Sequence, residues 1–500
     1  MSGVIVNRVR KGFYLDSVAL MRLSKAVSIL DGVEDAALMI GTPSNKQFLA
    51  EAGLLADDGE EATVSDLIIG IRAKDHKAAK AALAHTDALL KGSARRPGGQ
   101  KWRPKTLRAA MQVAPDANLA IISVPGTFAA AEARKALRLG LHVMVFSDNV
   151  PLEDEISLKR EAQERGQLVM GPDCGTAIIN GIPLVFANRV PKGSIGIIAA
   201  SGTGFQEVAS LIARAGQGIS QGIGTGGRDL ADEVGGITTL MAIDALDADP
   251  ETEKIILLSK PPGPRVATAI VDRVALSPKA FTLCFLELEQ IDLPNNATLT
   301  PTLKAAAEHA LGNITFGESF LIEDIVDTLT TRGRWVRGLY TGGTLCAEAQ
   351  MILIKGGLGV ASNAPVPGAT EAAADSHLMH VMLDLGADEY TAGRPHPMID
   401  PEVRSEHLHN ALNNEEVAVL LLDVVIGFGA HRDPAGWVAA VLDGVRHQRP
   451  TIIASVCGTE GDPQIRSTQV RKLEHAGVIV APSNAQAAEL ALRIVQRWEK

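Results

Sequence analysis

The residues best placed for chemistry are Ser201, Gly202, Thr203 and Gly204, which stand at the end of the apolar run SIGIIAAS (194–201) and open a helix-like stretch. Glycines let a backbone approach an anion closely, hydroxyls donate hydrogen bonds, and a helix N-terminus offers free N–H groups and a favourable dipole. The same residues also suit a glycine-rich turn in which a hydroxyl caps the helix. The sequence therefore predicts a phosphate- or carboxylate-binding turn here, with a helix cap as the alternative.

A second candidate is the stretch GFGAHRDPAG (427–436), which follows the longest apolar strand and precedes a helix from Trp437. It offers the same turn before a helix, with a histidine and an arginine in addition. The expected phosphate-binding residues are Gly427, Gly429 and Ala430. His431 is a catalytic candidate, and Arg432 is a candidate for clamping a carboxylate. The alternative is a surface loop with solvated polar residues.

Two further strand ends carry small or charged residues that could contact a substrate. Neither has the full glycine pattern of a dinucleotide site, so the prediction is limited to substrate binding. The residues are Gly227, Arg228 and Asp229 at one strand end, and Gly342, Gly343 and Thr344 at the other.

Lys260 is the candidate for stabilising charge in a transition state, and so a catalytic residue. It ends the apolar run KIILLSK (254–260), and ligands bind at the carboxyl ends of strands in parallel sheets. The two prolines that follow fix the backbone beside it. The alternative is a structural ion pair with an acid such as Asp229 or Glu287.

Histidines and cysteines do not have the spacing of metal ligands, so no metal site is predicted. The histidines closest together are His377 and His380, and His407 and His409, with His396 standing alone. Cysteines stand far apart at 174, 284, 346 and 457, which favours a reducing compartment over a disulfide framework. Cys174 ends a strand-like run and could be a nucleophile, although buried cysteines are common.

The elements that must position these residues are short apolar runs, each followed by a helix-like stretch. Continuous apolar strands that alternate with helices indicate parallel sheets of an α/β protein. A chain of 500 residues is long enough for several domains, and we expect three, at 1–190, 191–330 and 331–500. The second and third echo one another, because AASGTG matches YTGGT and GIGTGG matches VIGFGA.

Charge and hydropathy restrict the partners and the compartment. A net charge of −10 argues against nucleic acid or an anionic membrane as the main partner. No stretch approaches the ~20 apolar residues that cross a bilayer, and the first residues lack the pattern of a cleaved signal. We therefore expect a cytoplasmic protein.

Taken together, these stretches resemble the NDP-forming acyl-CoA synthetase superfamily, which includes succinyl-CoA synthetase. The similar stretches are GPDCGT (171–176), KGSIGIIAASGTGFQE (192–207) and GIGTGGRDL (222–230). The C-terminal third is similar to the C-terminal domain of that enzyme's β-subunit. The resemblance implies a CoA-binding-type Rossmann domain followed by two flavodoxin-like domains whose phosphate-site helices converge. It also places GFGAHRD in the loop before the second of those helices.

A resemblance to the FdrA family covers nearly the whole chain. It is carried by GFYLDSVALM (12–21), NVPLEDEISLK (149–159), MGPDCGTAIINGIPL (170–184), SKPP (259–262), RGLYTGGTLCAEA (337–349) and GRPHPMIDP (393–401). This resemblance implies a subunit of oxamate carbamoyltransferase, which converts oxalurate and phosphate into oxamate and carbamoyl phosphate in allantoin breakdown. Phosphate is then a substrate, CoA is a candidate ligand, and the expected partners are other transferase subunits, with a homodimer as a further arrangement.

Two departures from the synthetases bear on mechanism. Their phosphohistidine follows the strand read here as FTLCFL (281–286), but no histidine occurs between His142 and His309, and His309 lacks the preceding glycine. A carboxylate-bearing stretch of the synthetases is replaced by SKPP, and no ATP-grasp region occurs. Two alternatives therefore stay open: an acyl-CoA synthetase subunit with a separate ATP-grasp partner, and a non-catalytic binding or regulatory subunit.

Overall fold

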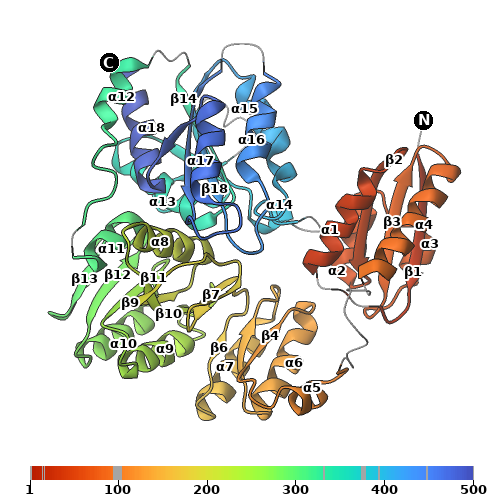
Figure 1. The fold of residues 1–500 in the computed structure, drawn as a ribbon, viewed down its shortest axis with the longest axis horizontal. Coiled ribbons are helices and arrows are strands. Elements are labelled where there is room, and N and C mark those ends of the chain that lie inside the picture. The colour runs from red at the N-terminus through yellow and green to blue at the C-terminus, as the bar shows by residue number, and fades with distance from the viewer. Residues whose placement is uncertain are drawn as a thin grey trace. The chain divides into compact units, whose positions relative to one another are not determined.

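The computed structural model describes residues 3–13, 15, 17–93, 104–312, 314–329, 333–372, 379–391, 395–445 and 449–498. They divide into two compact units, one of residues 1–116 with 388–395 and one of residues 117–387 with 396–500. Figure 1 shows alternating helices and strands along most of the chain, which confirms the predicted α/β class. No described helix is long and apolar enough to span a membrane.

The first unit is built on a three-stranded antiparallel sheet in the order β1-β3-β2. Its central strand β3 is almost wholly buried, since helices and both outer strands cover it. The strands are β1 (Val4–Arg10), β2 (Val33–Ile40) and β3 (Leu67–Ala73), and the helices are α1 (Ser17–Ser28), α2 (Pro43–Glu51), α3 (Asp57–Glu60), α4 (His76–Ser93), α5 (Leu107–Val113) and α14 (Asp388–Thr391).

The second unit begins with a small parallel sheet, β4-β5-β6. Its strands are β4 (Leu119–Ile122), β5 (His142–Val145) and β6 (Val169–Met170), with helices α6 (Gly126–Arg138) and α7 (Leu152–Glu164). Apolar residues of this sheet, including Met144 and Met170, pack into one core with the neighbouring seven-stranded sheet.

That first seven-stranded sheet has the order β13-β12-β11-β9-β10-β7-β8. Its strands β9 to β13 are parallel and follow the order 2-1-3-4-5 of flavodoxin-like folds, while the hairpin β7-β8 adds an antiparallel edge. The strands are β7 (Thr176–Ile179), β8 (Ile182–Val185), β9 (Lys192–Ala199), β10 (Ile219–Gly224), β11 (Lys254–Ser259), β12 (Ala280–Phe285) and β13 (Ala297–Leu299), and the helices are α8 (Gly202–Arg214), α9 (Ile237–Ala248), α10 (Pro264–Ala275) and α11 (Leu303–Ala310).

The second seven-stranded sheet is wholly parallel, in the order β16-β15-β17-β14-β18-β19-β20. From β17 to β20 it repeats the 2-1-3-4-5 order, with β14 as the first strand. The strands are β14 (Trp335–Tyr340), β15 (Val360–Ser362), β16 (Thr370–Glu371), β17 (His380–Asp384), β18 (Val417–Val425), β19 (Thr451–Cys457) and β20 (Ile479–Ala481). The helices are α12 (Ile322–Thr328), α13 (Gly343–Lys355), the 3-10 helix η2 (Pro401–Arg404), α15 (Ser405–Leu412), α16 (Pro434–Asp443), α17 (Arg466–His475) and α18 (Asn484–Trp498).

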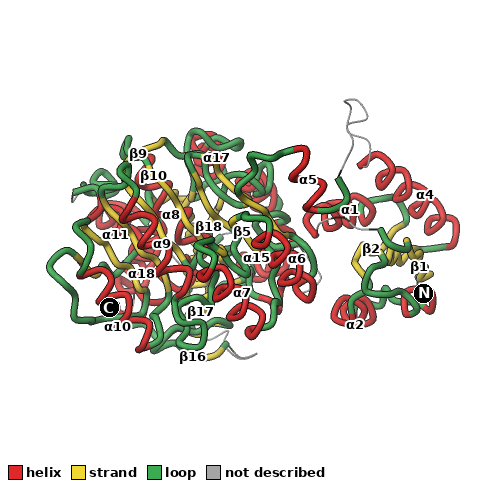
Figure 2. Tube along the Cα trace, turned by 90° about the horizontal axis from the view of Figure 1, so that it is seen from below, coloured by secondary structure: helices red, strands yellow, loops and turns green. Residues whose placement is uncertain are grey.

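A shared helical layer joins the two large sheets. Figure 1 shows α8 and α11 of the first sheet facing α13 of the second, and Figure 2 shows strands enclosed by helices in this unit. Apolar side chains of α8, α11, α13 and α18 belong to one buried core that extends into both sheets. This packing brings the helix N-termini at the carboxyl ends of β9 and β14 together.

The range 1–190 differs from the single Rossmann-like domain predicted for it. The runs 36–43 and 66–73 do form strands, but they pair antiparallel in a separate unit. A continuous apolar run indicates that both faces of a strand are buried, but it does not indicate the direction of the strand. The sequence therefore could not distinguish a parallel from an antiparallel sheet. In addition, β7 and β8 join the sheet of β9. The predicted boundary at 330/331 lies outside the described residues.

Candidate anion-binding site

The N-termini of α8 and α13 meet at the centre of the second unit. Ser201 is the N-cap of α8, and its Oγ accepts a hydrogen bond from the Gly204 N–H at 3.0 Å. The same Oγ lies 2.5 Å from Oγ1 of Thr344 in the first turn of α13. Both first turns are fully described and contain no acidic residue. Two helix N-termini and two hydroxyls therefore converge, which suits a small anion. At the α13 end the Asp384 carboxylate also lies close, 2.5 Å from a Cβ built on Gly343.

Glycines let these two turns approach closely. A Cβ built on Gly342 would lie 2.8 Å from Oγ1 of Thr203, and one on Gly204 would lie 3.1 Å from Cγ2 of Thr344. Ser201 and Thr203 are half-buried and Gly202 is exposed, so solvent reaches the junction. The predicted residues 201–204 and 342–344 thus lie side by side, a pairing that the sequence did not indicate.

Asp423, in the buried strand β18, holds the turn before α13. Its carboxylate accepts hydrogen bonds from the N–H groups of Thr341 and Gly342, each at 2.8 Å, and from the Thr341 hydroxyl at 2.9 Å. Arg404 lies 3.5 Å from the same carboxylate, and both side chains are buried. Burial raises the pKa of Asp423, while Arg404 and the donated hydrogen bonds oppose that rise. The α13 turn is therefore fixed by a residue far away in the sequence.

The loop 427–431 is anchored mainly by Gln464. The Gln464 amide donates to the carbonyl groups of Gly427 and His431, at 2.9 and 3.0 Å, and accepts from the Gly427 N–H at 3.1 Å. Gly427 and Gly429 have φ of 126° and 81°, a region that favours glycine. Ala430 and His431 are half-buried, and Arg432 is exposed.

The helix after this loop, α16, differs from the expectation of a second convergent helix. Asp433 caps its N-terminus, because one carboxylate oxygen accepts the Gly436 N–H at 3.1 Å and the other pairs with Lys472 at 2.5 Å. A carboxylate already occupies that helix end. In the second sheet it is α13 that packs against α8. Phosphate binding by Gly427, Gly429 and Ala430 stays a prediction.

Residues 186–189 lie between the α8 turn and the loops after β18 and β19, and they were not identified from the sequence. The Phe186 carbonyl accepts the Thr176 hydroxyl at 2.7 Å, and Thr176 adjoins Gly202. Asn188 is buried and donates to the Ile426 carbonyl and the Asp462 carboxylate, both at 2.8 Å. No motif marks these residues, because they act through contacts that span more than 200 positions of the chain.

Asp229 lies in a buried charge network with α7, and the exposed Arg228 contacts the same network from outside. Lys159 contacts Asp229 at 2.7 Å and Glu155 at 2.9 Å, and Arg228 contacts Glu155 at 2.8 Å. Asp229 also accepts hydrogen bonds from Thr239. These contacts fix the turn after β10 against α7, while Gly227 has open space around its Cα.

Lys260 is exposed at the end of β11, beside the strand that leads into Ser201. It forms no ion pair with any described residue, but it lies close enough to influence Glu287: burial raises the pKa of this carboxyl, and the charge of Lys260 opposes that rise. Asp229, the other predicted partner, pairs with Lys159 instead.

The surroundings of Cys174, His380 and His396 favour structural roles for these side chains. Burial raises the pKa of Cys174 to about 12, so this thiol stays protonated. Burial lowers the pKa of His380 and of His396 to about 4, and Nδ1 of each accepts a backbone N–H. His377 lies outside the described residues. Among those described, no three His, Cys, Asp or Glu side chains are grouped to hold a metal ion.

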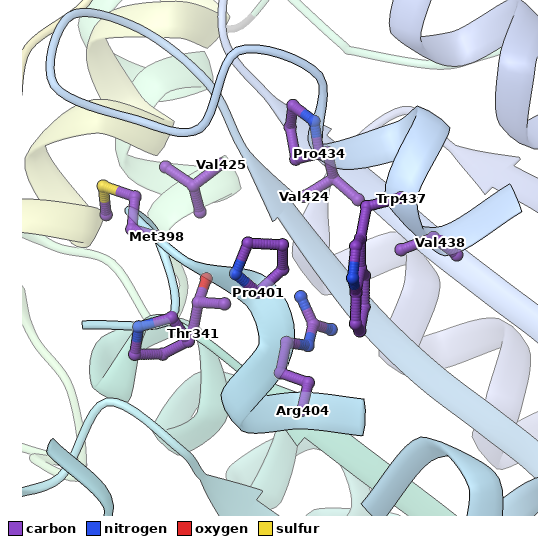
Figure 3. Close-up of a pocket in the computed structure, with 10 residues that line it drawn as sticks. Thr341, Met398, Pro401, Arg404, Val424, Val425, Pro434, Trp437 and Val438 are labelled. Atoms are coloured by element: carbon purple, nitrogen blue, oxygen red, sulfur yellow. The ribbon is translucent and has the colours of Figure 1, made fainter. Parts of the chain in front are cut away.

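Figure 3 shows a small cavity behind the α13 turn. Its volume is about 10 Å³, and its lining includes Thr341, Met398, Arg404 and Trp437. That space admits about one water molecule. The cavity therefore cannot hold a substrate.

Comparison with known proteins places the chain among CoA-ligase-like proteins. A family model described as CoA-ligase matches residues 339–494, and one described as AllF, heavy metal-associated domain, matches residues 1–105. The uncharacterized protein YahF of Escherichia coli (strain K12) is 40% identical over 98% of this chain and 99% of its own length. The chain belongs to the FdrA family.

More distant relatives match part of the chain. Subunit alpha-2 of the ADP-forming succinate–CoA ligase of Trichomonas vaginalis is 34% identical over 29% of this chain, which spans 47% of that subunit. The malate–CoA ligase subunit alpha of Methylorubrum extorquens is 30% identical over 33% of this chain and 56% of its own. A solved acetyl-coenzyme A synthetase of Ca. Korarchaeum cryptofilum covers 80% of this chain and 88% of its own, with 15% identity and a TM-score of 0.32.

The description of the N-terminal model implies a heavy metal, and the residues do not fit one. Residues 1–105 contain no cysteine, and the four cysteines of the chain are buried in the second unit. Soft metals prefer thiolate ligands. This stretch therefore has no thiolate with which to hold such a metal.

Proposed function

We propose that the convergent N-termini of α8 and α13 bind phosphate, and that the protein transfers a carbamoyl or acyl group to and from it. The observation that carries this proposal is the meeting of Ser201 and Thr344, 2.5 Å apart, at two helix ends whose described first turns contain no acid. A bound dianion would accept N–H and hydroxyl donors from both helices, and charge-assisted hydrogen bonds are the strong ones. Membership of the FdrA family supports the oxamate carbamoyltransferase reaction as the particular chemistry.

In that reaction a phosphate oxygen attacks the ureido carbonyl carbon of oxalurate. The new C–O bond gives carbamoyl phosphate, the C–N bond to the oxamate nitrogen breaks, and the phosphate proton ends on that nitrogen. The protein must orient phosphate and stabilise the oxyanion that develops on the carbonyl oxygen. We assign the first task to Ser201, Thr344 and the helix N–H groups, and the second to Lys260.

Free phosphate, rather than a phosphohistidine, is the expected species at this site. In the synthetases the phosphohistidine follows the strand that corresponds to FTLCFL (281–286). Here the first histidine after that strand is His309 on α11, and its Nδ1 lies 2.8 Å from the Thr282 hydroxyl. Incubation with labelled ATP or carbamoyl phosphate should leave no alkali-stable, acid-labile label on the protein. Such a label on His309 or His431 would contradict this proposal.

A second candidate is a subunit of an acyl-CoA ligase whose ATP-grasp region is a separate chain. The CoA-ligase match over residues 339–494 and the similarity to ligase α-subunits favour it. In either case we expect the chain to work in a hetero-oligomer.

The deciding experiment mixes the purified chain with candidate partner subunits, oxalurate and phosphate, and measures carbamoyl phosphate. The proposal expects product that depends on phosphate and needs neither ATP nor CoA. ATP consumption that requires CoA would instead establish the ligase. Tight ligand binding without turnover in any combination would indicate a non-catalytic subunit.

A further inference from the structure

We propose that Arg189 binds the carboxylate of the substrate and so selects acids such as oxalurate and oxamate over uncharged amides. This inference rests on the proposed function, because it concerns the second half of the same ligand. Arg189 lies in the 186–189 segment that joins the α8 turn to the loops after β18 and β19.

The backbone of Arg189 is held on both sides. Its N–H donates to the Asp462 carboxylate at 2.7 Å, and its carbonyl accepts the Thr459 hydroxyl at 2.7 Å. Asp462 also accepts the Asn188 amide and the Thr459 N–H. The start of the arginine side chain is therefore fixed before any ligand arrives, which reduces the entropy that binding would lose.

The side chain lies between Phe428 and Gly461, and none of the described residues neutralises its charge. The guanidinium carbon is 5.9 Å from the centre of the Phe428 ring, and a Cβ built on Gly461 would lie 3.2 Å from Cγ and Cδ of Arg189. Contact with an aromatic face does not use the N–H donors in the guanidinium plane. Arg189 is exposed and forms no ion pair with the described residues. Its N–H groups can therefore donate two hydrogen bonds to a carboxylate in a bidentate arrangement.

Other arginines near the site are less suitable. Arg228 contacts Glu155 and the Val150 carbonyl, and Arg404 is buried against Asp423. Arg432 is exposed, and no hydrogen bond or ion pair with a described residue orients it. Arg189 combines a fixed backbone, an aromatic support and an unneutralised charge.

Arg189 and the helix ends lie along one continuous set of contacts. Gly429 adjoins the ring of Phe186, and Gln206 of α8 donates to Asn188 at 3.1 Å. A ligand whose reacting carbonyl faces Ser201 and Thr344 would extend along this segment toward Arg189. The carboxylate of oxalurate lies at the end of the molecule away from the carbonyl that phosphate attacks, which matches this arrangement.

The test measures binding of oxamate, oxamide and phosphate to the reconstituted complex by calorimetry. Arg189→Gln should weaken oxamate binding about 10- to 100-fold, the range for a lost charge-assisted contact, and leave phosphate affinity unchanged. Oxamide, which has no carboxylate, should bind equally to both proteins. Arg189→Lys should restore part of the oxamate affinity, and Phe428→Leu should lower it less than Arg189→Gln does.

The matched control is Arg471→Gln, which removes the same charge from an exposed position on α17. It should change none of the three affinities. An unchanged preference for oxamate over oxamide in Arg189→Gln would overturn the inference while leaving the proposed function standing. A wild-type complex that binds neither phosphate nor oxamate would overturn the proposed function, and this inference with it.

Discussion

The segments β9–α8 and β14–α13 are two versions of one strand–turn–helix design. Each follows the first strand of a sheet ordered 2-1-3-4-5, and each helix begins Gly-Thr-x-x-x-Glu. The glutamates, Glu207 and Glu348, are buried and meet at Asn484, whose N–H donates to the first at 3.1 Å and whose amide donates to the second at 2.8 Å. The two halves of the site are therefore related in architecture as well as in sequence.

The halves differ in what holds the turn. Ser201 caps α8 with its own hydroxyl, whereas α13 has no side-chain cap and depends on Asp423 from a neighbouring strand. Loss of the Ser201 cap should leave the core unaffected, because the cap is local. Loss of the Asp423 carboxylate should destabilise the core, because this group is buried and paired with Arg404. The difference predicts that the second turn governs stability and the first governs ligand affinity.

The largest expected effect comes from Asp423→Ala. Removing this carboxylate leaves Arg404 charged and buried and leaves the Thr341 and Gly342 N–H groups without an acceptor. Loss of one partner of a buried pair typically costs about 3–5 kcal/mol. Urea unfolding should show that loss, while Ser201→Ala should cost about 0.5–2 kcal/mol, as cap substitutions do. Equal losses of unfolding free energy in the two variants would contradict the prediction that the second turn, rather than the first, governs stability.

Lys260→Met tests an asymmetry between the sheets. Lys260 directly follows the third strand of the first sheet, whereas the third strand of the second sheet is followed by the glycine loop at 427, in which the arginine, Arg432, comes several residues later. If Lys260 stabilises the developing oxyanion, its loss should lower turnover about 100- to 1000-fold. Lys192→Met, at an exposed pair with Glu251, is the control. Near-wild-type turnover with an unchanged Tm would mean that Lys260 does not stabilise the transition state.

The pH dependence of stability should report on Glu348. Burial raises the pKa of this carboxyl to about 7 from an ordinary value of 4.5. A carboxyl whose folded-state pKa is raised contributes stability that is lost as pH rises through this window, here by about 3 kcal/mol. Urea unfolding at pH 5 and pH 8 should show a larger loss in wild type than in Glu348→Gln. Glu323→Gln, at an exposed position on α12, should behave as wild type.

Local patterns in the sequence identified the α8 turn, because strand, glycines, hydroxyls and helix are contiguous there. They did not identify its partner. The sequence matched GIGTGG with VIGFGA, but the first follows the second strand of its sheet and the second follows a third strand. Sheet order depends on packing of whole elements, which composition does not report. For the same reason Asp423, Asn188 and Arg189 carried no signal, since each acts through partners distant in the chain.

The smallest expected effect comes from a double variant of the α8 turn, which separates phosphate binding from folding. Ser201→Ala with Gly202→Val removes the shared hydroxyl and adds bulk to an exposed position, where the nearest side-chain atom to a new Cβ is Thr176 Oγ1 at 3.1 Å. Lost hydrogen bonds to a charged ligand should weaken phosphate binding about 10- to 100-fold. Thr106→Ala is the matched control, because Thr106 caps α5 through the same bond, to the Ala109 N–H at 3.2 Å, in the first unit. Calorimetry with phosphate should therefore separate the two variants although both lose a helix cap. Equal phosphate affinity in both would mean that Ser201 is a cap and nothing more.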